Sequence, residues 1–176
     1  DLVEVAADED GCGRQSRVRF ASEAGTTYYL VVGGYGGAQG DVVLRRAVVA
    51  PPLSDAFSAP AVLDPGGGTL EVATSAATAE GGEPPHAGSG AAHSVWYSWT
   101  APADGPVAFR TCGSDFDTVL AVYQGDALGG LAPLATSDDR CELGSSVGLQ
   151  ATAGTTYRVA VDGFHGAAGT ATLTWG

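Results

Sequence analysis

The feature that most constrains this fold is a repeat, because the beginning of the chain matches its end. The run Ala-Gly-Thr-Thr-Tyr at residues 24–28 recurs at residues 153–157, which is 129 positions later. The same offset pairs residues 2–44 with residues 131–173 without a gap. Chance does not keep register over so many positions, so the chain contains an internal repeat.

The repeat also indicates that both copies are built from β-strands. Residues 28–32 and their matches, 157–161, carry large apolar side chains at every second position. The residues between these positions differ freely from one copy to the other. A strand with one side against a core has this pattern, because successive side chains point to opposite faces.

Only the second copy is complete. Residues 1–47 match the closing third of the unit, and the 82 positions equivalent to 48–129 have no counterpart upstream. A few strands without an opposing sheet cannot bury their apolar face. We therefore expect the first copy to be completed by a removed part of the same polypeptide or by another chain. The predicted organisation is the C-terminal part of a first repeat (1–47), a short stiff linker (48–54) and a complete repeat (55–176).

The complete copy predicts about eight short strands separated by turn-forming residues. The expected strands are residues 69–73, 94–100, 107–111, 118–123, 131–135, 147–151, 157–161 and 171–175. Residues 74–93 are expected to form an irregular loop, and residues 55–57 a short helical turn capped by Asp55. Short strands at regular spacing predict an all-β fold, a jelly-roll-like β-sandwich.

The charge balance excludes two classes of partner. Twenty acidic residues oppose eight Arg, without a single Lys, for a net charge of −12. Nucleic acid and anionic membrane surfaces both require a basic face, so neither is an expected partner. Membrane insertion is not expected either, because no apolar run approaches the ~18 residues of a membrane span.

Two pairs of acids lie in loops that the fold is expected to bring together. Clustered carboxylates repel one another unless a cation offsets them, and their oxygens suit a hard cation such as calcium. We therefore predict a calcium site. The predicted ligands are Asp115, Asp117, Asp138 and Asp139, with Glu83 as a further contributor. The alternative is that these acids are solvated turn residues without a metal.

One catalytic sequence motif is matched, but not in the structural context that it requires. Residues 144–148 satisfy G-x-S-x-G, but a nucleophile elbow needs a strand before it and a helix after it, whereas here a strand follows. The three histidines lack zinc spacing. Trp96 and Trp99 could form a sugar-stacking platform, but core packing is the favoured role for both. No nucleophile, base and orienting group fall together, so we do not expect an enzyme.

Four stretches carry a resemblance to a known family. Residues 95–102, which read Val-Trp-Tyr-Ser-Trp-Thr-Ala-Pro, together with 111–123, 137–139 and 153–163, resemble the bacterial pre-peptidase C-terminal domain and its relatives. These are secreted β-sandwich modules, often in tandem or appended to extracellular enzymes. The resemblance implies an accessory or binding module. Some relatives, including the collagen-binding domains of bacterial collagenases, are stabilised by calcium. Many relatives carry Asn where Ser137 stands, which weakens one candidate oxygen ligand here.

The cysteines divide into an expected pair and one left over. We expect a disulfide between Cys112 and Cys141, which places the protein outside the cytoplasm. Two free buried thiols are the alternative. Cys12 matches Cys141, and its own partner would lie in the missing part of the first copy. Cys12 is therefore either unpaired in this chain or bonded to another chain.

These observations together predict a non-catalytic structural or adhesive repeat that is secreted or displayed on the cell surface. It would act in a filament or surface assembly, as a homo-oligomer or as tandem copies joined through residues 1–47. The alternative is an accessory module of a secreted hydrolase that targets a protein or polysaccharide substrate.

Overall fold

The computed structural model describes residues 2–10, 13, 15–18, 20, 22, 25–47 and 49–176. The chain divides into two compact units, Asp1–Val48 and Val49–Gly176, termed here the N-terminal unit and the sandwich unit. Across the described ranges, helices that could cross a bilayer are absent.

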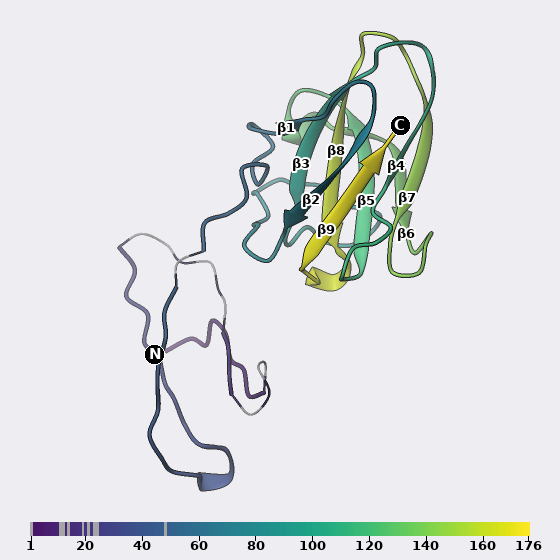
Figure 1. Ribbon diagram of the computed structural model, residues 1–176. Coiled ribbons are helices and arrows are strands. Elements are labelled where there is room, and N and C mark those ends of the chain that lie inside the picture. The colour runs from purple at the N-terminus through teal and green to yellow at the C-terminus, as the bar shows by residue number, and fades with distance from the viewer. Residues whose placement is uncertain are drawn as a thin grey trace. The chain divides into compact units, whose positions relative to one another are not determined.

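Residues 49–176 form nine strands in two sheets (Figure 1). The strands are β1 (Ala61–Val62), β2 (Gly68–Ala73), β3 (Val95–Thr100), β4 (Gly105–Arg110), β5 (Thr118–Gln124), β6 (Ala132–Asp138), β7 (Ser146–Ala151), β8 (Thr156–Gly163) and β9 (Thr170–Trp175), with 3-10 turns η2 (Leu128–Gly130) and η3 (Phe164–Gly166). One sheet has the order β1-β3-β8-β5-β6 and the other β2-β9-β4-β7. The predicted all-β sandwich is confirmed.

The predicted strands of the complete copy are all present, with ends that differ by at most three residues. The structure adds β1, which the sequence did not predict because two residues are too short to show a period. The predicted helical turn at 55–57 is wrong. Asp55 does not cap a local N–H; its carboxylate accepts hydrogen bonds from the backbone N–H (2.6 Å) and the hydroxyl (3.0 Å) of Thr78.

The main core lies between the two sheets. Along β9, Ala171, Leu173 and Trp175 point inward and are buried. The Trp99 ring meets the ring of Phe109 edge-on, with centroids 5.7 Å apart. Burying such large apolar side chains contributes about 1.5–3 kcal/mol each, which makes this layer the main source of stability.

A second apolar layer covers the outer face of the β3-β8-β5 strands. It consists of Phe57, Trp96, Ala121, Tyr123 and Ala160. Residues on both faces of β5 are therefore buried. Trp96 and Trp99 lie in different layers, and both pack in the interior, which is the role that the sequence favoured over a sugar platform.

The N-terminal unit contrasts with the sandwich unit in its secondary structure. Its described residues contain the 3-10 turn η1 (Tyr35–Gly37) and no assigned strand. Large apolar side chains that would face a core are exposed instead: Leu30 is 54% exposed and Leu44 is 63% exposed. Strand-forming sequence alone therefore does not produce a sheet in this unit.

The two units nevertheless share one turn in detail. η1 and η3 stand 129 positions apart, the offset of the sequence repeat. In both turns the middle residue has a left-handed backbone, with φ of 60° at Gly36 and 50° at His165. The residue before each turn is Gly34 or Gly163, where a Cβ would overlap the carbonyl oxygen four residues later. Both copies therefore require glycine at this position.

A hydrogen bond is also shared at the repeat offset. The backbone N–H of Arg17 donates to Oδ2 of Asp8 at 2.6 Å. At the matching positions, the backbone N–H of Ser146 donates to the hydroxyl of Ser137 at 3.2 Å. The local geometry of the two copies is therefore similar where their burial differs.

Candidate functional site

Three carboxylates meet at one end of the sandwich unit. Within the described chain, Asp117, Asp138 and Asp139 offer ligand atoms that all lie within 4.8 Å of one another. Asp117 directly precedes β5, Asp138 ends β6, and Asp139 begins the following turn with φ of 56°. β5 and β6 pair with Val119 opposite Asp138, so strand pairing brings these acids together.

The loops that carry these acids are joined covalently. Cys112 and Cys141 form a disulfide with Cα atoms 5.8 Å apart, which confirms the predicted pair. Gly144 packs against it, because a Cβ there would lie 2.9 Å from the Cys141 sulfur. Cys12, predicted to be unpaired or bonded to another chain, lies outside the described residues.

Buried hydroxyls fix the backbone beneath the three carboxylates. The Ser145 hydroxyl lies 2.7 Å from the carbonyl oxygen of Thr118 and 2.9 Å from that of Ser137. The Ser145 N–H donates to the hydroxyl of Thr111, which also contacts the hydroxyl of Thr118 at 2.6 Å. These side chains are all buried, so their hydrogen bonds fix the backbone of the loops that carry the acids.

The three carboxylates are electrostatically unfavourable as they stand. Burial, followed by the charges of Asp139 and Asp138, raises the pKa of Asp117, and His165 opposes the increase. Burial and the charge of Asp139 likewise raise the pKa of Asp138. Oδ1 of both Asp117 and Asp138 is buried without a hydrogen-bond partner among the described residues. An oxygen-only donor set with two orphaned oxygens fits a hard cation such as calcium.

Asp115 and Glu83, the other two predicted ligands, lie elsewhere. Oδ1 of Asp115 accepts a hydrogen bond from the backbone N–H of Thr170 at 2.7 Å, where β9 begins. Glu83 belongs to the 74–93 loop, and its side chain is buried. Of the five predicted ligands, the structure therefore brings Asp117, Asp138 and Asp139 together and engages Asp115 and Glu83 in other contacts. Each of the two carboxylates satisfies protein N–H groups that would otherwise lack an acceptor.

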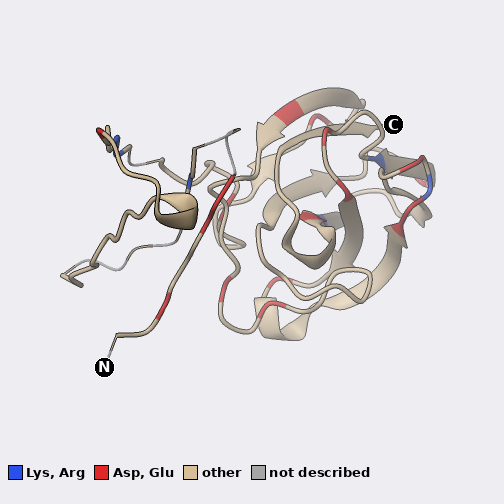
Figure 2. Ribbon diagram, turned by 90° about the horizontal axis from the view of Figure 1, so that it is seen from below, with Lys and Arg blue, Asp and Glu red and all other residues tan. Residues whose placement is uncertain are grey.

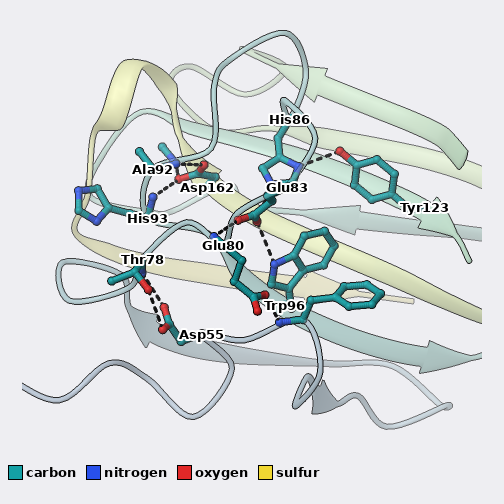
Figure 3. A network of polar contacts seen from close by, with 12 residues as sticks. Asp55, Thr78, Glu80, Glu83, His86, Ala92, His93, Trp96, Tyr123 and Asp162 are labelled. Carbon is teal, nitrogen blue, oxygen red and sulfur yellow. Dashed lines mark hydrogen bonds and ion pairs between the residues drawn. The ribbon is translucent and has the colours of Figure 1, made fainter. Parts of the chain in front are cut away.

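Glu83 is the centre of a buried polar network (Figure 3). Its Oε1 accepts a hydrogen bond from Nε1 of Trp96 at 2.9 Å and contacts Nε2 of His86 at 3.1 Å. Nδ1 of His86 lies 2.7 Å from the hydroxyl of Tyr123. Because an ionised carboxylate only accepts, Nε2 of His86 carries the proton that it donates to Glu83.

The pKa values of this network follow from burial and from its hydrogen bonds. Burial acts to raise the pKa of Glu83, but the hydrogen bonds from His86 and from the Glu80 N–H, among others, bring it below its ordinary value. Burial and the nearby Glu83 charge raise the pKa of Tyr123 to about 12. The network therefore holds an ionised acid and a neutral phenol under one loop.

Further acids attach the same loop to the sandwich (Figure 3). Glu80 accepts a hydrogen bond from the Phe57 N–H at 2.6 Å. Asp162 accepts hydrogen bonds from the N–H groups of Ala92 and His93 at 2.9 and 2.8 Å. Backbone donors engage these carboxylates, so their role here is to hold the loop, and none is poised as a free base.

Two shallow hollows on the described surface of the sandwich unit have linings without catalytic side chains. One is lined by residues 106–108, 148–150 and Gly176, and the other by residues of β5, β6, β7 and β8 and the loop after β7. Neither hollow is lined by an acid, a histidine or a cysteine. Acidic residues are distributed over the strands and loops of the sandwich unit, whereas basic residues are few (Figure 2).

Comparison with known proteins gives a likeness to solved structures but none to a family model. No protein-family model and no curated protein matches the chain. Among solved structures, the chain is similar to a crystal structure of the pre-peptidase C-terminal domain of a collagenase from Bacillus anthracis. The match has a TM-score of 0.43 and 12% identity, and it covers 62% of this chain and 89% of that chain. That structure comes from the family that residues 95–102 resemble.

Proposed function

We propose that the sandwich unit is a non-catalytic extracellular module that binds calcium at Asp117, Asp138 and Asp139. The observation that carries this proposal is the pair of buried, unpartnered Oδ1 atoms of Asp117 and Asp138 beside a third carboxylate. A bound cation would offset the mutual repulsion of the three charges. It would also tie the start of β5 to the end of β6, next to the disulfide.

Calcium is the cation that this donor set favours. It takes six to eight oxygen ligands in flexible geometry, and carboxylates bind it through one oxygen or two. Three carboxylates therefore supply between three and six of these ligands, and water and backbone carbonyls can supply the remainder. Zinc is a poorer choice because its sites in proteins are built mainly from nitrogen and sulfur.

Two observations support a non-catalytic role outside the cell. The buried carboxylates of Glu83 and Asp162 are engaged by hydrogen bonds, and the two hollows are not lined by an acid or a histidine. The Cys112–Cys141 disulfide persists only in an oxidising compartment. The exposed apolar run of the N-terminal unit favours a structural repeat in a tandem array over an isolated substrate-targeting module.

Thermal unfolding of the whole chain, with calcium and with EDTA, tests the metal. At a free calcium concentration 100 times the dissociation constant, binding to the folded state adds about 2.7 kcal/mol, so Tm should rise. Asp138→Asn should abolish the rise. Glu71→Gln is the matched control, because it removes one charge from an exposed position on β2 and should leave the rise intact.

The same variants give an inverse result without metal. In EDTA at neutral pH, Asp138→Asn should be more stable than the parent, because it removes a carboxylate whose raised pKa disfavours the charged form. A calcium-induced rise of equal size in the parent and in Asp138→Asn would place the metal elsewhere. A parent that does not respond to calcium would contradict the proposal.

A further inference from the structure

The strand order of the sandwich unit separates its last four strands from one another. β6 and β8 both pair with β5, which lies between them. β7 and β9 both pair with β4, which lies between them (Figure 1). β8 takes its other partner from β3, and β9 takes its other partner from β2. The closing third of the sandwich therefore contains no ladder of its own.

The N-terminal unit is a copy of that closing third. At the repeat offset, β6, β7, β8 and β9 correspond to residues 3–9, 17–22, 27–34 and 41–46. The structure describes all of these positions except 19 and 21. None of the described positions is assigned to a strand, although the turn and the hydrogen bond described above are retained. These segments have the sequences of strands, but their described positions are not part of a sheet.

The side chains that would meet such partners are exposed. In the sandwich unit the inward-facing residues Val159, Val161 and Leu173 are each 0% exposed. Their counterparts Leu30, Val32 and Leu44 are 54%, 56% and 63% exposed. Pairing would thus bury apolar surface as well as satisfy backbone hydrogen bonds, which are the two contributions that a marginal set of strands requires.

We propose that the N-terminal unit is a docking surface for one occupant, a polypeptide segment equivalent to residues 48–129. That segment supplies counterparts of β1 to β5. Its β5 counterpart inserts between residues 3–9 and 27–34, and its β4 counterpart between residues 17–22 and 41–46. The product is a second complete sandwich. This inference is independent of the calcium site.

An intact second copy of the chain does not meet this requirement. Its β4 and β5 strands already have partners on both sides, and its free edges are β1, β6, β2 and β7. Pairing at an edge adds a strand beside a sheet, but it does not insert one between two strands. The partner in this proposal is therefore a segment whose β4 and β5 counterparts are still unpaired. It replaces the homo-oligomer that the sequence led us to expect.

The test restores the missing segment in register. A second copy of residues 48–129 is fused ahead of Asp1, so that Gly129 of the added segment meets Asp1 as it meets Gly130 in the parent. Hydrogen exchange is then followed by mass spectrometry. In the parent, amides of 27–34 and 41–46 should exchange within the shortest labelling time. In the extended chain they should slow to the rates of β8 and β9.

Two controls keep the result interpretable. In the first, the added segment has the same composition, but its β4 and β5 sequences are shuffled; it should give no protection. In the second, isolated residues 49–176 are added in trans; protection there would make an intact copy the partner and overturn the proposal. The sandwich unit is an internal standard. If its strands are protected while 27–34 still exchange rapidly in the extended chain, the proposal fails.

Discussion

Residues 27–34 and β8 have matching sequence patterns and opposite environments. Both alternate large apolar residues with variable ones, and both lead into the same 3-10 turn. Val159 of β8 is fully buried, whereas its counterpart Leu30 is half exposed. The turn is determined by local residues such as Gly34, so it forms in both units. The strand depends on partners distant in sequence, so it forms only where β3 and β5 are present.

This difference shows which contributions to stability are local. A turn needs a permissive backbone at one or two positions, which glycine provides wherever it occurs. A strand gains its stability from cross-strand pairs and buried apolar area, and an isolated pair of strands is marginal in water. Each of the following predictions changes one unit and uses the other as its reference.

The largest effect is expected from removing a core side chain at repeat-equivalent positions. Leu173→Ala should lower the free energy of unfolding by about 3–5 kcal/mol, because it leaves a cavity between the sheets. Leu44→Ala, at the matching position, should change it negligibly, because Leu44 is 63% exposed. Urea unfolding followed by tryptophan fluorescence measures both. Equal losses would mean that the two units share one core.

A smaller effect is expected from the disulfide. The double variant Cys112→Ser/Cys141→Ser should lose about 3–4 kcal/mol, the chain-entropy value for a loop of this size. The bonded residues are 29 apart in sequence. Cys12→Ser is the reference. Cys12 matches Cys141, but no residue of this chain matches Cys112 at the repeat offset, so this variant should leave the unfolding transition of the sandwich unit unchanged. Reduction of the parent should reproduce the double variant.

The effect on stability that is smallest at neutral pH comes from the buried tyrosines. It becomes visible only in alkali, where their hydroxyls ionise. Burial raises the pKa of Tyr97 and Tyr123 to about 12, against about 10 in an unfolded chain. The folded state therefore retains these protons between pH 10 and 12. Stability should be full below pH 10 and should decline through that window, because ionisation favours the unfolded chain.

Near-ultraviolet circular dichroism and phenolate absorbance, recorded together, measure this decline. Tyr123→Phe should reduce the decline, whereas Tyr35→Phe should not, because Tyr35 is 83% exposed. A stability that is constant from pH 9 to 12 would contradict the expected coupling.

Most of the fold could be predicted because the repeat exposes the inward-facing positions. Comparing two copies distinguished retained from variable residues in β8, and the predicted strand ends are accurate to three residues. β1 was not predicted because a strand of two residues is too short to show the alternation of apolar and polar residues. The predicted capping role of Asp55 was wrong because its carboxylate accepts a hydrogen bond from the backbone N–H of Thr78, which is 23 residues away in sequence.

The candidate site was predictable only where strand pairing determines it. Asp117 and Asp138 lie at the ends of adjacent strands, so their approach follows from the fold. Glu83 lies in an irregular loop, and the sequence has no periodic pattern there that would predict the hydrogen bond between Glu83 and Trp96. The three-residue spacing of Glu83 and His86 is the one local hint of that network. The contact of Asp115 was not predictable because its partner, the Thr170 N–H, is 55 residues away.

The position of β9 has a consequence for synthesis on the ribosome. β9 is the last strand of the sandwich unit, yet it separates β2 from β4 within its sheet. A nascent chain that has emerged through β8 therefore still carries β2 as an unpartnered edge, the kind of surface through which chains misassociate. In a tandem array, each repeat would remain vulnerable until its last few residues leave the exit tunnel.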